Sequence, residues 1–474
     1  MIALSLAEIS QAVDGVLHLA GPASAADQIS GSVQTDSRLI EPGSIFVAKP
    51  GAQTDGHLFA PVAAERGAAL LLVERTLDLP VTQIVVDDAV AALGALAHAV
   101  VARVRAAGQL KVVAVTGSNG KTTTKNLLHS MLERVGPTVA PRGSFNNQVG
   151  APMTMLEVTA DTRFLVIEMG ASSEGAIAHL VSLARPDVGI VLTVGLAHAG
   201  EFGDLDATVR AKSEMVTDLL ETDVAVLNAD DPRVAQMAAL TPARIVRFGQ
   251  YGPVSGGQID VRASDLHGSR TGTTFTLHLA NGQSAPVVFR VLGEHHVMNA
   301  LAAAAAADVL GVSLTDIVTA LESTTRAERW RMEVLGGKDD VTVINDAYNA
   351  SPDSMSAALK TLAQIGTPGR RTIAVLGEMA ELGELAGEEH DRIGLLAVRL
   401  NISQMIVVGP RARRMHISTI NEGSWDGESA YVDTPEEAFD LVRSTVSPGD
   451  TVLVKSSNSA GLRFLGDRLG DLFS

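Results

Sequence analysis

The sequence predicts an α/β protein of three domains. The chain has 474 residues, and because domains typically hold about 150 residues, its length alone favours about three. Short apolar, β-branched runs alternate with segments of helical spacing, which is the pattern of a parallel sheet covered by helices. Hydrophobic residues make up 46% of the chain and charged residues 19%, so several cores can be buried and disorder is disfavoured.

Charge and residue types exclude several classes of protein. The formal net charge is −17, and such a chain repels nucleic acid unless it carries a local basic patch. No basic run is longer than Arg411–Arg414, so we expect no nucleic-acid partner. Because the chain contains no cysteine, disulfides, thiolate metal sites and a cysteine nucleophile are excluded.

Neither a targeting segment nor a membrane span is expected. Met1–Gln11 contains the acidic Glu8 and lacks the basic start and long apolar stretch of a signal peptide. The most apolar windows, such as Ala89–Val104, are too short or too interrupted to cross a bilayer. The sequence therefore predicts a soluble cytoplasmic protein without membrane insertion.

The first predicted domain spans residues 1–108. It mixes strand-like runs with Gly, Pro and Asp turns, and it closes with the alanine-rich helix Ala89–Ala107, which ends at Gly108. The strand-like runs are Ser44–Ala48, Ala69–Val73 and Gln83–Val86.

The second predicted domain spans residues 109–326 and opens with a strand, a turn and a helix. Lys111–Thr116 is β-branched and apolar, Gly117–Gly120 forms the turn, and Thr122–Val135 has helical spacing. The Thr- and Gly-rich stretch Arg244–Arg290 predicts an antiparallel addition. Further strands are expected at Phe164–Ile167, Val188–Val194 and Val224–Asn228, with helices at Glu174–Ala184, Leu205–Leu220 and Val297–Leu310.

The third predicted domain spans residues 327–474 and repeats the alternation of strand and helix. Its strands are expected at Val341–Asn345, Thr372–Leu376, Gln404–Val408 and Thr451–Lys455, and its helices at Ser354–Ile365, His390–Leu400 and Pro435–Ser444.

A glycine-rich turn joins the first strand and helix of the second domain. Glycines let backbone N–H groups approach phosphate oxygens, and the start of the helix adds partial positive charge. Lys121 can bridge the β- and γ-phosphates, and the Thr122 hydroxyl can ligate Mg²⁺. Such a turn can also be purely structural, but its place between a strand and a helix favours nucleotide binding. The turn reads Gly117, Ser118, Asn119, Gly120, Lys121, Thr122, Thr123.

Two polar residues follow other strands of the same sheet. Glu168 ends an apolar run, and a carboxylate at the carboxyl end of a parallel strand is well placed to bind Mg²⁺. It could equally cap the next helix. His198 also follows a strand; a lone histidine is more often structural, and only this position favours a role in the site.

With these residues the chain resembles the Mur ligase superfamily, whose members carry a Gly-Thr/Ser-Asn-Gly-Lys-Thr-Thr loop. The resemblance extends through nearly the whole chain. It implies that Glu168 and His198 bind Mg²⁺ together with Thr122. It also implies that Lys212, which alone reads as a solvated helix lysine, is carbamylated, so that a cation becomes an anion able to hold the metal.

The resemblance implies further contacts at residues that otherwise read as turn, cap or surface positions. Asn146 and Asn147 would lie near substrate and phosphate. An arginine would grip the nucleotide phosphates when the third domain closes. The ATP pocket would be lined by Asn228, Asn299, Arg331, Asp346, Tyr348 and Asn349.

In the first domain, the resemblance implies that Ser37 and Arg38 hold the UDP end of the substrate, since an arginine can clamp a diphosphate with two hydrogen bonds.

Features of the third domain resemble the branch of the family that adds D-alanyl-D-alanine. These are the Tyr348-Asn349 pair and the segment Gly377–Gly383. Lys455 and Ser456 would hold the dipeptide or a phosphate, although Asn458 stands where this branch commonly has an arginine.

The resemblance therefore implies an N-terminal UDP-binding α/β domain, a central P-loop ATPase-like domain with a parallel sheet, and a C-terminal Rossmann-like domain that closes on ATP. The expected activity is the ATP- and Mg²⁺-dependent joining of D-alanyl-D-alanine to a UDP-N-acetylmuramoyl-tripeptide through an acyl phosphate, in peptidoglycan precursor synthesis, by a monomer.

Three alternatives stay open. A sibling ligase would add the third residue of the peptide, but the Asp-Asn-Pro-Arg motif expected for it is missing from the third domain. A folylpolyglutamate synthetase would have no use for residues 1–108. A catalytically silent nucleotide-binding partner in a cell-wall complex would not need every phosphate and metal position to be present.

Overall fold

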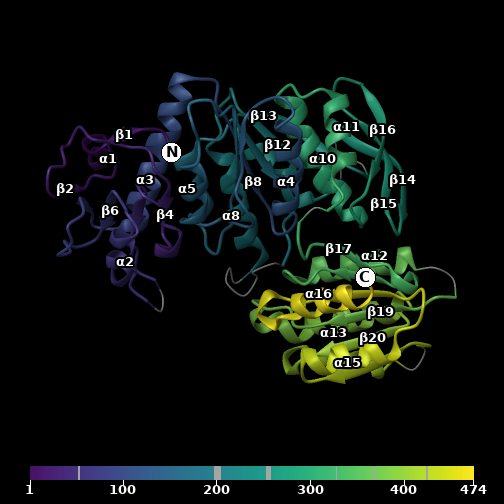
Figure 1. The fold of residues 1–474 in the computed structure, drawn as a ribbon. Coiled ribbons are helices and arrows are strands. Elements are labelled where there is room, and N and C mark those ends of the chain that lie inside the picture. Colours follow the sequence, from purple (N-terminus) through teal and green to yellow (C-terminus); the bar gives the residue numbers. More distant parts are fainter. Residues whose placement is uncertain (52–53, 197–203, 252–257, 327, 367–368, 423–424) are drawn as a thin grey trace.

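The computed structural model describes the chain except for residues 52–53, 197–203, 252–257, 327, 367–368 and 423–424. The chain forms three bodies in sequence order, seen in Figure 1 as purple-blue, teal and green-yellow regions. The predicted site residue His198 lies outside the described residues.

The N-terminal body contains a five-stranded sheet of order β2-β7-β6-β5-β4 and a two-stranded sheet, β1-β3. The predicted strands are present, and helix α3 (Ala89–Ala107) has the bounds expected from the sequence. It begins where the Asp88 side chain accepts hydrogen bonds from the N–H groups of Val90 and Ala91. The other elements are β1 (Leu4–Ser5), α1 (Leu6–Ala12), β2 (Val16–His18), β3 (Gln28–Ile29), β4 (Val33–Gln34), η1 (Ser37–Leu39), β5 (Ile45–Val47), η2 (Gly56–Phe59), α2 (Ala60–Glu65), β6 (Leu70–Val73) and β7 (Gln83–Val85).

Helix α3 joins the first two bodies. By length and composition it is the one helix among the described residues that could cross a membrane, but 50% of its apolar window is buried. It packs against α1 on one side and against α5 (Gly150–Met155) and α6 (Ala176–Ala184) on the other. These contacts are those of a core helix in a folded α/β protein.

The central body is built on a nine-stranded sheet of order β16-β15-β14-β13-β12-β11-β8-β10-β9. The pairings from β9 to β14 are parallel, and β14, β15 and β16 pair antiparallel. The prediction for Arg244–Arg290 is therefore right for its later part, but wrong for its first strand, which extends the parallel sheet. The strands are β8 (Lys111–Thr116), β9 (Thr138–Val139), β10 (Phe164–Glu168), β11 (Val188–Val191), β12 (Val224–Asn228), β13 (Arg244–Gly249), β14 (Val261–Ser269), β15 (Gly272–His278) and β16 (Ser284–Phe289).

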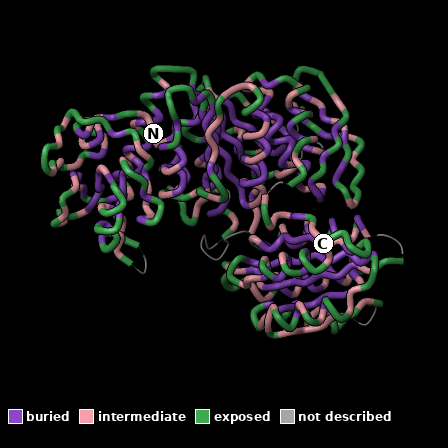
Figure 2. Tube along the Cα trace, viewed as in Figure 1, coloured by how far each residue is buried: buried purple, intermediate pink, exposed green. Residues whose placement is uncertain are grey.

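Helices cover both faces of the parallel part of this sheet, so that β8, β10, β11 and β12 are almost wholly buried (Figure 2), whereas β14 and β16 expose many of their residues. Val112 and Ala114 of β8 belong to one hydrophobic core, while Val113 and Val115 belong to the other, as the alternation of a strand requires. The alanine run Ala302–Ala307 of α10 is fully buried and allows close packing on α4. The remaining helices are α4 (Lys121–Leu132), α8 (Leu205–Thr217), α9 (Pro232–Gln236), η3 (Met237–Leu240), α10 (Glu294–Val309) and α11 (Leu314–Ser323).

The C-terminal body is a six-stranded sheet of order β17-β18-β22-β19-β20-β21 with helices on both faces. All its strand pairs are parallel except that of β17 with β18. A mostly parallel sheet with helices on both faces is Rossmann-like. The sequence did not predict β17, β21, α14 or α16. The elements are β17 (Glu333–Gly336), η4 (Lys338–Asp340), β18 (Thr342–Asn345), α12 (Pro352–Ile365), β19 (Thr372–Leu376), η5 (Gly383–Leu385), α13 (Ala386–Arg399), β20 (Gln404–Val408), η6 (Pro410–Ala412), α14 (Arg413–Ile420), β21 (Glu428–Val432), α15 (Pro435–Thr445), β22 (Thr451–Lys455), η7 (Asn458–Ala460) and α16 (Leu462–Leu472).

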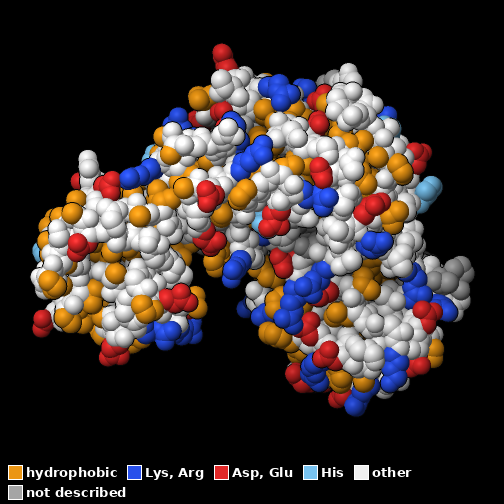
Figure 3. Space-filling model, turned by 45° about the horizontal axis from the view of Figure 1, so that its top comes forward, with side chains coloured by type: hydrophobic (Ala, Val, Ile, Leu, Met, Phe, Trp, Pro, Cys, Tyr) orange, Lys and Arg blue, Asp and Glu red, His pale blue; other side chains and the backbone are white. Residues whose placement is uncertain are grey.

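The surface carries no broad field of one charge on the face drawn in Figure 3, where acidic and basic side chains are interspersed. This distribution fits the expectation of small anionic substrates bound in a local site.

Candidate active site

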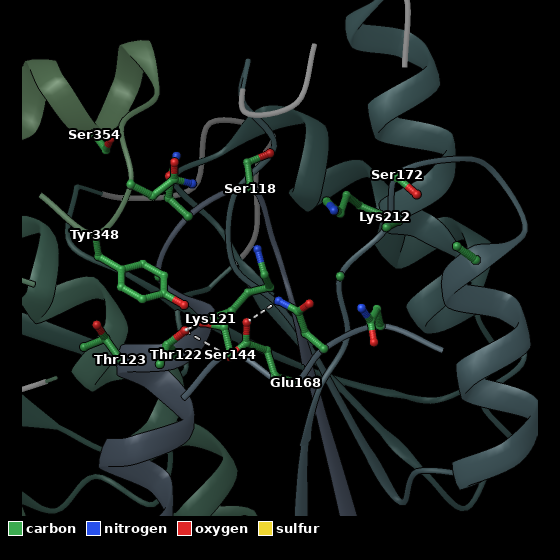
Figure 4. A pocket seen from close by; sticks show the side chains of 18 of the residues that line it. Ser118, Lys121, Thr122, Thr123, Ser144, Glu168, Ser172, Lys212, Tyr348 and Ser354 are labelled. Carbon is green, nitrogen blue, oxygen red and sulfur yellow. Dashed lines mark hydrogen bonds between the residues drawn. The ribbon is translucent and has the colours of Figure 1, made fainter. Parts of the chain in front are cut away.

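A cavity of about 820 Å³ opens at the carboxyl ends of β8 and β10 and is lined by both the central and the C-terminal bodies. Figure 4 looks into it and shows Lys121, Thr122 and Ser144 beside Glu168, with Lys212 on one side and Tyr348 on the other. Ligands of parallel α/β sheets bind at this edge, because loops and helix N-termini converge there.

The loop after β8 has the geometry of a phosphate-binding loop. Gly120 has φ 85°, and a Cβ atom there would lie 2.2 Å from Oδ1 of Asn299, so only glycine fits. The Ser118 hydroxyl accepts a hydrogen bond from the N–H of Gly195 at 2.9 Å, which ties the loop to the segment after β11. The Lys121 ammonium donates to the carbonyl of Gly117 at 2.7 Å. Burial lowers the pKa of Lys121, and the nearby Glu168 partly opposes this.

Glu168 ends β10 and is 1% exposed. Its Oε2 atom accepts a hydrogen bond from the Thr122 hydroxyl at 3.0 Å, and its Oε1 atom accepts one from the Asn146 amide at 2.7 Å. The Ser144 hydroxyl lies 3.0 Å from that of Thr122. Because both donors to the carboxylate are neutral, its negative charge is free to attract a cation.

These atoms fit a magnesium ion. A buried carboxylate and two hydroxyls are the hard oxygen ligands that Mg²⁺ prefers, with the remaining positions left to water and phosphate. The described residues contain no cluster of three His, Asp or Glu side chains that could bind a metal, so Glu168 would need the hydroxyls, a modified lysine or His198 as co-ligands.

Two buried lysines flank this cluster. Lys212 of α8 is 2% exposed, and burial, with the positive charge of Lys121, lowers its pKa to about 7. Lys125 of α4 is also 2% exposed and donates to the carbonyls of Pro141 at 2.7 Å and Gly143 at 3.3 Å. The sequence analysis missed Lys125, which fixes the loop that carries Ser144.

The C-terminal body contributes a second group of side chains. Lys455 donates to Asp346 Oδ2 at 2.6 Å and to the carbonyl of Asn349 at 3.1 Å. The guanidinium carbon of Arg331 lies 4.4 Å from the ring centre of Tyr348. Across the body boundary, the hydroxyl of Ser351 donates to Asn119 Oδ1 of the phosphate loop at 3.2 Å.

Most of the predicted site residues meet in this cavity. Those that line it are Ser118, Asn119, Gly120, Lys121, Thr122, Thr123, Asn146, Asn147, Glu168, Lys212, Asn299, Arg331, Asp346, Tyr348, Asn349 and Lys455. Gly117, the first residue of the loop, is not part of the cavity lining, but its carbonyl accepts the hydrogen bond from Lys121.

Besides Gly117, four predicted residues among those the structure describes do not line it. Asn228 instead accepts a hydrogen bond from the N–H of Asp230 and closes a turn. Ser456 is fully buried and donates to the carbonyl of Ser457. Ser37 and Arg38 lie in the N-terminal body, where Arg38 forms an exposed ion pair with Asp36.

The cavity also contains side chains that the sequence analysis missed. His295 and His296 open helix α10 beside Asn299, and their ring centres are 4.2 Å apart. Burial lowers the pKa of His295 to about 4 and that of His296 well below its usual value. The adjacent pair of histidines at a predicted helix start was the available signal.

Comparison with known proteins agrees with this geometry. Residues 31–114 match the Mur ligase family catalytic domain, residues 115–307 the Mur ligase middle domain, and residues 330–458 the Mur ligase glutamate ligase domain. The fold and site define an ATP-dependent, amide-bond-forming ligase, and the chain belongs to the Mur ligase family.

Individual relatives match nearly the whole chain. The UDP-N-acetylmuramoyl-tripeptide--D-alanyl-D-alanine ligase of Mycobacterium leprae is 42% identical, over 99% of this chain and 98% of that protein. A crystal structure of MurF from Acinetobacter baumannii aligns with a TM-score of 0.87 at 32% identity, covering 99% of each chain. A MurF ligase from Thermotoga maritima in complex with ADP aligns with a TM-score of 0.81 at 26% identity, covering 94% of this chain and 98% of that one.

Proposed function

We propose that this chain joins the amine of D-alanyl-D-alanine to the terminal carboxyl group of a UDP-N-acetylmuramoyl-tripeptide, driven by ATP, in peptidoglycan precursor synthesis. The observation that carries the proposal is the buried Glu168, hydrogen-bonded to Thr122 of the phosphate loop inside a cavity that the C-terminal body completes. The substrates are those named for the relatives that match nearly the whole chain.

In this proposal ATP would lie along the loop Gly117–Thr123, and Thr122, Glu168, His198 and the carbamate of Lys212 would hold Mg²⁺. The bound metal would neutralise charge on the transferred phosphoryl group. Asn228, Asn299, Arg331, Asp346, Tyr348 and Asn349 are the proposed nucleotide contacts, and Asn146 and Asn147 the proposed substrate contacts.

Carbamylation of Lys212 is supported by its environment. The neutral amine attacks CO₂, a C–N bond forms, and one proton is released to give a carbamate anion. Only the unprotonated amine can react, and burial lowers the pKa of Lys212 to about 7, so much of it is unprotonated near neutral pH. The product anion would lie beside Lys121, whose charge favours it.

The reaction then needs two steps. The tripeptide carboxylate attacks the γ-phosphorus of ATP and ADP leaves, which gives an acyl phosphate. The amine of the dipeptide attacks the acyl carbon, phosphate leaves, and the amine loses a proton. Lys121 stabilises the charge on the phosphoryl oxygens, and its reorientation from the Gly117 carbonyl toward ATP provides that contact.

The C-terminal body protects the acyl phosphate from water. Its Ser351 touches the phosphate loop at Asn119, so the two bodies already meet at the nucleotide site. The Lys455 ammonium donates hydrogen bonds to Asp346 and to the carbonyl of Asn349. We therefore assign it to holding the segment 346–349 rather than to binding the dipeptide. Ser456 is buried and does not line the cavity in this structure, and its contact with the dipeptide stays a prediction.

The role proposed for the N-terminal domain rests on the charge and the exposure of Arg38. We propose that residues 1–108 bind the UDP end, with Arg38 exchanging its exposed partner Asp36 for the diphosphate, beside Ser37. Residues 109–326 bind ATP, and residues 327–474 close on it. We further propose a cytoplasmic monomer without membrane insertion.

A phosphate-release assay tests the function. We expect steady release from ATP and Mg²⁺ only when both the UDP-N-acetylmuramoyl-tripeptide and D-alanyl-D-alanine are present. Release with the dipeptide replaced by lysine or diaminopimelate, on a UDP-muramoyl dipeptide, would contradict the proposal in favour of a sibling activity. The absence of release under every condition would contradict an enzymatic role.

A further inference from the structure

A tight turn at the start of the C-terminal body brings Arg331 to the active-site cavity. In the turn 328–331, the N–H of Arg331 donates to the carbonyl of Glu328 at 3.3 Å. Trp330 and Met332 have φ of 59° and 49°, a left-handed conformation that residues other than glycine rarely adopt. A backbone of this kind keeps its shape only where the surrounding structure holds it.

The C-terminal body holds one side of the turn. Oε2 of Glu333 accepts a hydrogen bond from the N–H of Trp330 at 2.9 Å, and Oδ1 of Asp346 accepts one from the N–H of Met332 at 3.0 Å. The carbonyl of Trp330 accepts a third from the N–H of Tyr348 at 3.3 Å. These bonds fix the turn relative to its own body, but they do not fix it relative to the phosphate loop.

The Glu328 side chain connects the turn to the central body. Its Oε2 atom accepts a hydrogen bond from the Asn126 amide at 3.0 Å, and its Oε1 atom accepts one from the N–H of Arg329 at 3.0 Å. Asn126 lies on α4, four residues after Thr122 of the phosphate loop. The positive charge of the neighbouring Lys125 also attracts the Glu328 carboxylate. One carboxylate therefore bridges the turn and the phosphate-loop helix.

The chain on either side of this contact lies against open space. A second cavity, of about 750 Å³, is lined by Asn126 and Ser130 on α4 and by residues 323–326 and 333–335 on the opposite side. Because a hollow of this size separates the helix from these segments, packing there contributes little to their relative position. The hydrogen bond between Asn126 and Glu328 matters correspondingly more.

We propose that Asn126 is a positioning residue, which through Glu328 holds the turn 328–331 on the phosphate-loop helix and so places Arg331 at the nucleotide. The inference rests on the proposed function, which assigns Arg331 to the nucleotide. Asn126 does not line the active-site cavity, so its effect reaches the nucleotide through the turn.

An exchange of donor and acceptor tests the hydrogen bond itself. Asn126→Asp keeps the shape of the side chain but turns a carboxylate toward Glu328, so that the pair repels. In the double variant Asn126→Asp, Glu328→Gln the new aspartate accepts a hydrogen bond from the new glutamine amide, and the contact is restored in reverse. Ser130→Asp adds the same charge about one turn further along α4, in the same second cavity, and is the matched control.

The measurement is steady-state ligation by the full chain with ATP varied, together with thermal unfolding of every variant. We expect Asn126→Asp to lower kcat/KM for ATP about tenfold to a hundredfold, since a displacement of about 1 Å can cost about a hundredfold in rate. The double variant should return to within about threefold of the wild type, and Ser130→Asp should leave the value unchanged. In an Arg331→Ala background, Asn126→Asp should cause no further loss, because the group that it displaces is already missing.

Wild-type kcat/KM in Asn126→Asp would overturn the inference, and so would a loss that the double variant does not recover. Losses that add in the Arg331→Ala background would overturn it as well, because the contact would then act on the fold in general. Should Asn126→Asp fail to fold, Glu328→Ala takes its place, with the same expected loss and no further loss in the Arg331→Ala background. A wild-type chain that does not ligate would overturn the proposed function, and this inference with it.

Discussion

Replacing Lys455 with methionine separates a structural role from a substrate contact. The Lys455 side chain is 2% exposed, and its ammonium group lies 2.6 Å from Oδ2 of Asp346, whose side chain is 10% exposed. Methionine has a similar length, so the change removes the charge and the donors while largely filling the same volume. Among the residues that the structure describes, the Asp346 carboxylate then keeps only the hydrogen bond from the N–H of Met332, at 3.0 Å.

The expected cost follows from this geometry. Removing one partner of a buried ion pair leaves an uncompensated charge and costs about 3–5 kcal/mol. In the double variant Asp346→Asn, Lys455→Met no charge is left, so we expect a loss of only about 1–2 kcal/mol from the missing hydrogen bonds. The two changes are in contact and must therefore be non-additive.

Urea unfolding followed by tryptophan fluorescence measures this directly. The chain has two tryptophans, and both, Trp330 and Trp425, lie in the C-terminal body, so the signal reports the body that contains the ion pair. A Lys455→Met chain that unfolds at the wild-type midpoint but has lost ligation would refute the reasoning, because it would make Lys455 a substrate contact.

Three other changes test the phosphate and metal site. Thr122→Val removes the hydroxyl that donates to Glu168 at 3.0 Å; the Mg²⁺ concentration for half-maximal ligation should rise about tenfold to a hundredfold, and Thr122→Ser should restore it. Ligation should increase as the pH rises through about 7, because Lys212 loses its proton there, and removal of CO₂ and bicarbonate should abolish this increase; an unchanged rate without CO₂ argues against the carbamate. Gly120→Ala should weaken ADP binding at least about tenfold, because this position has φ 85° and the added Cβ would lie 2.2 Å from a neighbouring atom. Gly409→Ala, at φ 87° with open space around it, should leave ADP binding unchanged.

The elements that the sequence predicted well have strong local signals. Strands β8, β12, β19, β20 and β22 are continuous apolar runs between turn residues, and their bounds agree with the prediction. Such runs identify strands reliably because both faces of a parallel strand are buried, so its apolar residues are not interrupted by alternating polar ones.

Helix α16 shows why other elements were missed. It contains Gly466 and Gly470, which lower helix propensity. In the structure each glycine permits close approach to the sheet: a Cβ at Gly466 would lie 2.4 Å from the side chain of Asn345, and one at Gly470 would lie 2.8 Å from Leu335. Tertiary packing thus requires residues that argue against a helix locally.

The candidate site likewise contains residues that the sequence identifies and residues that it does not. The phosphate loop and Glu168 could be found from the sequence, because a strand, a glycine turn and a helix are contiguous. Ser144 and Lys125 could not, since their roles depend on segments that meet only in the folded chain. Lys212 was assigned by family resemblance alone, and its burial now gives that assignment a physical basis.

The transfer of oxygen from substrate to phosphate tests the central claim most directly. The UDP-N-acetylmuramoyl-tripeptide is prepared with heavy oxygen in its terminal carboxyl group and incubated with ATP, Mg²⁺, D-alanyl-D-alanine and the chain. If that carboxyl group is phosphorylated at the Lys121–Glu168 site, the released phosphate carries a heavy oxygen atom, and Glu168→Gln abolishes the transfer. Ligated product accompanied by unlabelled phosphate would contradict the account.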